Sequence, residues 1–244
     1  MKRETLIAYS IKYNGDPFKI ARAVRDAEDV HIPLLIPQCV CLLDEEYPSL
    51  FRSLRHPPFV IYYYGNLKLL DLDTIGIVGS RDATPDALIN THKIAQILAK
   101  RYVVVSGMAR GIDTAVHLGA LVTGVTVAVL GSGIDYPYPY QNRDLYLSLK
   151  LNGLVISEYP GFTKPLKHHF PTRNRLIAAS NKGIVVTQAV CKSGTMLTVK
   201  EALELGREVY CLPYPYNSKE GAGCNLLLSQ GATILTNECD LDII

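Results

Sequence analysis

The chain has 244 residues, of which 48% are hydrophobic and 20% charged, a composition typical of a globular protein with a full core. Its formal net charge of +2 is too small to indicate a nucleic-acid partner, so any basic signal must be local. No apolar run approaches the ~18 residues that cross a bilayer. The N-terminus lacks a secretory pattern, so we expect a cytoplasmic protein without membrane contact. The six cysteines form no C-x-x-C pair, and we expect neither a metal site nor a cofactor.

Residues 1–38 are predicted to form a short helical extension, because residues 17–28 place an apolar stripe along one helical face. The segment is too short for a core of its own, so we expect it to pack on the rest of the chain. Residues 39–244 are predicted to form the main domain, which begins with a strand over residues 59–64.

Strand and helix patterns then alternate along the chain. The candidate strands are residues 74–78, 102–106, 125–130, 154–157, 183–187, 208–212 and 233–235. The candidate helices are residues 85–100, 113–122, 141–149, 173–180, 196–206 and 224–230. This alternation predicts an α/β fold, an extended Rossmann-like, doubly wound, mostly parallel sheet with helices on both faces. Such sheets bind ligands at the carboxyl ends of their strands.

Several of these strands end in residues suited to holding an anion. The strand over residues 102–106 runs into Ser106, Gly107 and a helix start, where free N–H groups and the helix dipole favour a phosphate. The first strand of the series ends at Ser80 and Arg81, and a guanidinium there offers a planar fork of donors. Asp113 is interpreted as a helix cap and His117 as a packed histidine.

The turn after residues 183–187 contains Lys192, Ser193 and Gly194 before a helix, which forms a further anion cradle. The most basic stretch is KPLKHHFPTRNR, residues 164–175. It contains no acid, and Phe170 lies among its cations. We expect Arg173 and Arg175 at the start of the next helix. Basic residues interleaved with an aromatic ring suit a single-stranded nucleic acid, since phosphates take the charge and a base stacks on the ring.

The sequence offers few candidate catalytic groups by comparison. Four serines at or near strand ends have no base partner in the local sequence, and no G-x-S-x-G, G-x-G-x-x-G or P-loop motif occurs. An alternative is a nucleotide hydrolase that resembles the lysine-decarboxylase-like phosphoribohydrolases, with Glu201 as its acid. A nucleotide sensor that uses the same cradles is a third possibility. We favour a protein that binds over an enzyme.

The ordered set of motifs resembles the DNA processing protein A (DprA, or Smf) family from about Val40 to Leu235. It consists of LLDEEYP, PPFVIYYYGN, IVGSR, VVSGMARGID, VAVLGSGIDYPYP, ISEYP, FPTRNRLIAAS, KSGTMLT and GREVYCLP. The resemblance implies an extended Rossmann fold that binds single-stranded DNA and forms homodimers. It also implies help in loading a RecA-type recombinase during natural transformation.

Carried over by position, the resemblance implies DNA contacts at nine residues: Ser80, Arg81, Phe170, Arg173, Asn174, Arg175, Lys192, Ser193 and Gly194. The arginines and Lys192 are expected to neutralise phosphates, and Phe170 to stack on a base. The sequence departs from the family pattern at Asp86 and Ala87, at Gln188 and at Tyr214. The winged-helix domain that many relatives append is not expected here.

Overall fold

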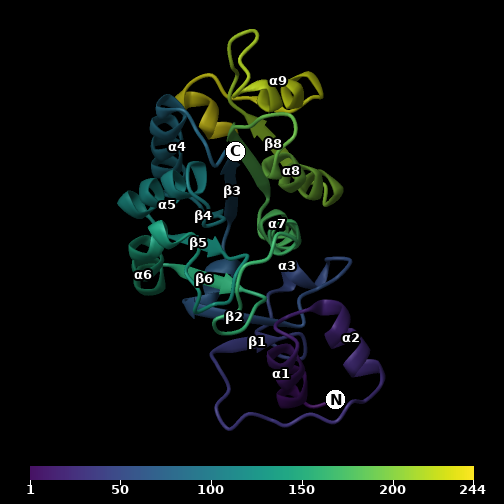
Figure 1. The fold of residues 1–244 in the computed structure, drawn as a ribbon. Helices are drawn as coiled ribbons and strands as arrows, with labels where there is room; N and C mark the ends of the chain where they lie inside the picture. Colours follow the sequence, from purple (N-terminus) through teal and green to yellow (C-terminus); the bar gives the residue numbers. More distant parts are fainter.

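The computed structural model describes residues 1–244 and is built on one nine-stranded sheet (Figure 1). Its strand order is β1-β2-β6-β5-β4-β3-β7-β8-β9. The strands are β1 Cys39–Cys41, β2 Val60–Gly65, β3 Thr74–Gly79, β4 Val103–Ser106, β5 Thr126–Val129, β6 Leu154–Ser157, β7 Gly183–Gln188, β8 Glu208–Cys211 and β9 Thr233–Ile234. The strands β3 to β9 pair in parallel, whereas β2 pairs antiparallel with both β1 and β6. The predicted mostly parallel α/β sheet is confirmed.

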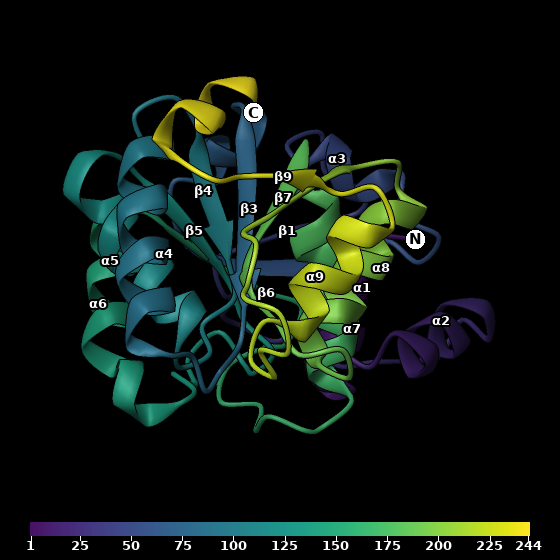
Figure 2. The same cartoon turned by 90° about the horizontal axis from the view of Figure 1, so that it is seen from above.

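Helices cover both faces of this sheet. They are α1 Arg3–Lys12, α2 Pro17–Arg25, α3 Ser49–Arg52, α4 Pro85–Leu98, α5 Ile112–Thr123, α6 Arg143–Asn152, α7 His169–Ala179, α8 Gly194–Glu204 and α9 Ala222–Ser229. Short 3-10 turns occupy Leu67–Asp71, Tyr140–Asn142 and Glu238–Ile243. Figure 2 shows α4, α5 and α6 on one side and α7, α8 and α9 on the other, which confirms the doubly wound arrangement. None of the helices has the length and apolar character that a membrane span needs.

The order of the parallel strands reverses at the centre of the sheet. From β3 the chain proceeds outwards through β4, β5 and β6, and then returns to β7 on the other side of β3. The helices that leave β3 and β7 therefore lie on opposite faces, and a crevice opens beyond the carboxyl ends of these two strands. The start of α4 is fixed there by Thr84, whose hydroxyl accepts a hydrogen bond from the N–H of Ala87 at 3.3 Å, and by Pro85 at the first helical position.

The N-terminal segment shares its core with the sheet. Leu6, Ile7 and Tyr9 of α1 belong to one buried cluster with Tyr62 of β2 and with residues of β5 and β6. The sequence predicted only the second helix, which the structure ends at Arg25. Helix α1 escaped prediction because its five consecutive residues 6–10 are all buried, so that no polar face alternates with an apolar one.

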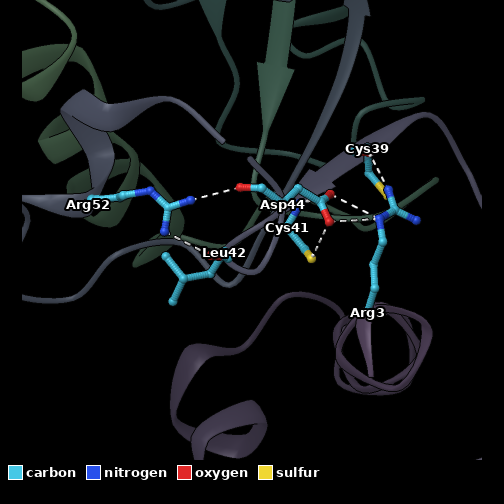
Figure 3. A network of polar contacts seen from close by, with 6 residues as sticks. All are labelled: Arg3, Cys39, Cys41, Leu42, Asp44 and Arg52. Atoms are coloured by element: carbon cyan, nitrogen blue, oxygen red, sulfur yellow. Dashed lines mark hydrogen bonds and ion pairs between the residues drawn. The ribbon is translucent and has the colours of Figure 1, made fainter. Parts of the chain in front are cut away.

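A polar network holds α1 on the first strand (Figure 3). The Nε of Arg3 donates to both carboxylate oxygens of Asp44, at 2.9 and 3.0 Å, and its Nη2 donates to the carbonyl of Cys39 at 3.0 Å. Asp44 also accepts from the N–H of Cys41 at 2.9 Å. Arg52 donates to two backbone carbonyls of the same turn. The network fixes the N-terminal helices to the edge of the main domain.

Candidate nucleic-acid interface

The crevice beyond β3 and β7 holds a cavity of about 560 Å³. Its walls come from the end of β3, the start of α5, α7 and the turn that opens α8. A second cavity of about 800 Å³ adjoins it, with walls from the turns after β4 and β5 and from the loop that precedes α7. The two share five residues, namely Arg81, Ala109, Tyr138, Phe170 and Arg173. We call the pair the central groove.

Arg173 is the most unusual group in the central groove. It lines both cavities although the residue is only 5% exposed. Its Nη1 donates to the carbonyl of Val129 at 2.6 Å, and its Nε has no partner. Burial lowers the pKa of Arg173, the charge of Asp113 acts in the opposite direction, and no carboxylate oxygen lies within 4 Å. A buried guanidinium so incompletely compensated is stabilised when an anion reaches it.

Gly107 makes room for this arginine. A Cβ atom at residue 107 would lie 2.1 Å from Nη1 of Arg173 and 2.3 Å from Oδ2 of Asp113. The carbonyl of Gly107 is bonded to Nε2 of the buried His117 at 2.6 Å, which fixes the turn. Burial lowers the pKa of His117, which favours a neutral ring. Asp113 is not the cap expected from the sequence, since α5 starts after Gly111 without a side-chain cap; it lies in the first turn of α5 and accepts from the N–H of Ala109 at 3.0 Å.

Phe170 divides the two cavities. The guanidinium of Arg81 lies over its ring at 5.1 Å, and the ring of Tyr138 lies 5.9 Å away. Gly131 permits this placement, because a Cβ atom there would lie 2.8 Å from the Phe170 ring. The exposed rings of Tyr140 and Phe162 extend the aromatic surface through the larger cavity. The central groove therefore alternates cations with rings.

The lining of the central groove contains more cations than acids, and some of these cations have no acidic partner. Asp82 pairs with Arg110 at 2.8 Å, and Asp135 accepts from the hydroxyl of Tyr64 at 2.6 Å. Three cations of the lining, Arg81, Lys167 and Arg173, have no carboxylate within 4 Å. With four cations and three carboxylates in its lining, the central groove has a formal charge of +1.

The start of α8 closes the other end of the groove. Ser193 caps this helix, and its hydroxyl accepts from the N–H of Met196 at 3.4 Å. Asn174 reaches across from α7 and donates to the carbonyl of Gly194 at 3.2 Å. Ser80 lies opposite, at the end of β3. Lys192 is exposed beside this turn but does not line either cavity.

The structure does not bring Arg175 to the groove. Helix α7 begins at His169, four residues before the start that the sequence suggested, because Pro171 is accommodated in the first turn. Arg175 instead forms a largely buried ion pair with Glu158, at 2.5 Å between Nη2 and Oε1. Burial raises the pKa of Glu158, and the charge of Arg175 counteracts this. The pair fastens α7 to the end of β6.

Sequence reasoning missed four groups of the lining. Tyr138, Tyr140 and Phe162 were not singled out, although a Tyr-Pro-Tyr-Pro-Tyr run at a predicted strand end was a signal for exposed rings. Lys167 was noted only as part of the basic stretch. It lines the smaller cavity.

Comparison with known proteins identifies the family. Residues 38–242 match the family model described as DNA recombination-mediator protein A. The chain belongs to this family. The DNA processing protein DprA of Streptococcus pneumoniae is 38% identical over 201 residues, which cover 82% of this chain and 71% of that protein. Protein Smf of Synechocystis is 40% identical over 211 residues, 84% of this chain but only 53% of the relative, so the chain spans about half of that protein.

Two solved structures of DNA processing protein A share the fold. The X-ray structure of the Streptococcus pneumoniae protein superposes with a TM-score of 0.84 at 35% identity, covering 93% of this chain and 82% of that one. A structure of DNA processing protein A from Helicobacter pylori superposes with a TM-score of 0.78 at 33% identity, and the match covers 85% of this chain and 95% of that one. That structure is described as giving insight into a unique single-stranded DNA binding mode of the Helicobacter pylori protein.

The departures from the family pattern have structural roles outside the groove. Gln188 accepts from the N–H of Thr84 at 2.9 Å and donates to its hydroxyl at 3.1 Å, which ties the end of β7 to the start of α4. Asp86 is exposed in the first turn of α4, where it suits the helix dipole. The hydroxyl of Tyr214 donates to the carbonyl of Thr187 at 2.6 Å. None of these side chains lines the central groove.

Proposed function

We propose that the central groove binds single-stranded DNA. Phosphates would lie against Arg173, Arg81 and Lys167, and bases would stack on Phe170 and Tyr138. The observation that carries the proposal is Arg173, a buried cation with an unpaired Nε and no carboxylate oxygen within 4 Å, in a groove lined by aromatic rings. The single-stranded DNA binding described for the Helicobacter pylori relative supports it.

The aromatic surface favours a single strand over a duplex. Unpaired bases expose the faces that stack on rings, and each such contact contributes about 1–3 kcal/mol. A duplex conceals those faces and could use only the cations. The N-terminus of α8, with Ser193 and Gly194, adds backbone donors for one further phosphate, and Lys192 is available beside it.

Binding without turnover is the function that we propose. The acids of the groove each have a structural partner: Asp82 pairs with Arg110, Asp113 with a backbone N–H, and Asp135 with a tyrosine hydroxyl. Glu201, the acid considered for a hydrolase, does not line either cavity. A nucleotide sensor would bind one nucleotide beside Arg173, and it would not need a groove made of two adjoining cavities.

We further propose that the protein acts as a recombination mediator, which the description of its family supports. It would hold incoming single strands as a homodimer and transfer them to a RecA-type recombinase. Natural transformation is one process that supplies such strands. Loading of this kind requires that the bound strand be released to the recombinase.

Fluorescence anisotropy of a labelled oligo-dT strand tests the binding proposal. Three neutralised phosphates give a slope of log K against log salt of about −2. We expect salt-dependent binding that unlabelled strand competes away far better than a matched duplex or a mononucleotide. Tight mononucleotide binding without strand binding would refute the proposal and favour the sensor, and release of a free base would favour the hydrolase.

A further inference from the structure

A third cavity, of about 940 Å³, lies on the other side of the loop that precedes α7. Its walls are this loop (residues 159–168), the turn between α1 and α2, and residues 33–37. We call it the outer groove. Figure 1 shows α1 and α2 at the end of the molecule opposite α9, so the outer groove belongs to the N-terminal extension and not to the sheet alone.

The outer groove repeats the chemistry of the central one. Phe18 at the start of α2 is 80% exposed although it lines the groove. Lys164 lines it from the opposite side and has no carboxylate within 4 Å. The one acid of the lining is Asp16, whose carboxylate accepts from the N–H groups of Phe18 and Lys19 at 3.0 and 3.1 Å. The groove thus offers an aromatic ring and an uncompensated cation.

The two grooves are continuous across one side chain. Phe162 is 76% exposed and lines both of them. The loop that carries it is fixed to the turn after β5, since Gly133 donates to the carbonyl of Thr163 at 2.7 Å and Asp135 donates to that of Gly161 at 2.9 Å. A ligand that leaves the central groove past Phe162 therefore meets a formed surface.

Cations lie on both sides of this same loop. Lys164 lines the outer groove, and Lys167, three residues later, lines the central one. A polyanion that crosses the loop would therefore find a lysine in each of the two grooves. This charge, together with the continuity through Phe162, selects a nucleic-acid strand over an apolar peptide as the occupant.

We propose that the outer groove is a second subsite for the same single strand, so that the N-terminal helices take part in DNA binding. The strand leaves the central groove past Phe162, places a phosphate against Lys164 and stacks a base on Phe18. The Arg3–Asp44 network would serve this subsite by holding α1 in place (Figure 3). The inference rests on the proposed function of the central groove.

A series of oligo-dT strands from about 4 to about 16 nucleotides, the range of single-strand site sizes, tests the inference by anisotropy. The variants are Lys164→Ala and Phe18→Ala in the full chain. Their matched controls are Lys100→Ala, an exposed lysine before β4, and Leu151→Ala, an apolar residue that is 84% exposed on α6. All four side chains lie at the surface, so folding should be preserved.

We expect Phe18→Ala to weaken binding of the longest strand by roughly fivefold or more and to leave the shortest strand unaffected. Lys164→Ala should reduce the salt slope of the longest strand by about 0.7, and that of the shortest not at all. Equal behaviour of the variants and their controls on long strands would overturn the inference. If the wild type binds strands of no length in the series, short ones included, the proposed function itself would be refuted instead.

Discussion

Replacement of Arg173 by methionine separates binding from stability. The change removes a charged hydrogen bond to phosphate of about 1.5–3 kcal/mol, so single-strand affinity should fall about 10- to 150-fold. The salt slope should shrink by about 0.7 because one phosphate loses its cation. The folded protein loses the hydrogen bond to Val129, about 1–3 kcal/mol, and the attraction between Arg173 and Asp113, but it no longer has to bury the charge of the guanidinium. The free energy of unfolding should therefore change by less than about 2 kcal/mol.

Anisotropy at several salt concentrations and urea unfolding measure the two effects on the same preparation. Arg55→Met provides the control, since Arg55 is exposed, has no ion pair and lines neither cavity. An unchanged salt slope in Arg173→Met would refute the assignment of Arg173 to a phosphate. A large loss of stability would show that the guanidinium is needed for the fold and not reserved for a ligand.

The same contacts support three further predictions. Phe170→Ala should weaken single-strand binding by about 1–3 kcal/mol and leave the salt slope nearly unchanged; a reduced slope would mean that the ring acts by positioning Arg81. Arg175→Ala should lower the free energy of urea unfolding by about 3–5 kcal/mol, because Glu158 stays buried and unpaired, and Glu158→Gln in the same chain should recover part of it. Full stability with a smaller salt slope would place Arg175 on the DNA after all. Burial lowers the pKa of His117 in the folded protein, so below about pH 6.5 the unfolded chain binds a proton at this imidazole that the folded chain does not. The free energy of unfolding should therefore fall by up to about 1.4 kcal/mol for each pH unit below that point. His117→Gln should flatten that dependence in urea unfolding, and an equal slope in both proteins would contradict the lowered pKa.

The parallel body of the sheet could be predicted because its strands are uniformly apolar and end in turn residues. Residues 103–105 read as a strand buried on both faces, and the structure places β4 there with all its residues buried. The strand order could not be predicted, since nothing local in β7 shows that it returns to the side of β3. The antiparallel edge made by β1 also went unpredicted. It consists of three residues, too few to show a pattern.

The site was predicted in part for a similar reason. Turn residues at strand ends indicate an anion site whichever strands are neighbours, so Ser80, Arg81, Ser193 and Gly194 could be named in advance. The ring of Phe162 could not, because its place in the groove depends on how the loop before α7 meets the turn after β5, which no local pattern encodes. Tyr140 differs, since the Tyr-Pro-Tyr-Pro-Tyr run is a local signal for its exposed ring.

Arg173 and Arg175 show how one boundary decides the function of a side chain. Residues two apart on a helix differ in direction by about 200°, so Arg173 and Arg175 lie on different sides of α7. With α7 beginning at His169, residues 170, 173 and 174 fall on one side at spacings of three and four, and all three line the central groove. Arg175 is then turned towards Glu158. Of the two arginines in the basic stretch, Arg173 is thus available to a ligand and Arg175 stabilises the fold. The residue at which α7 begins determines which arginine has which role.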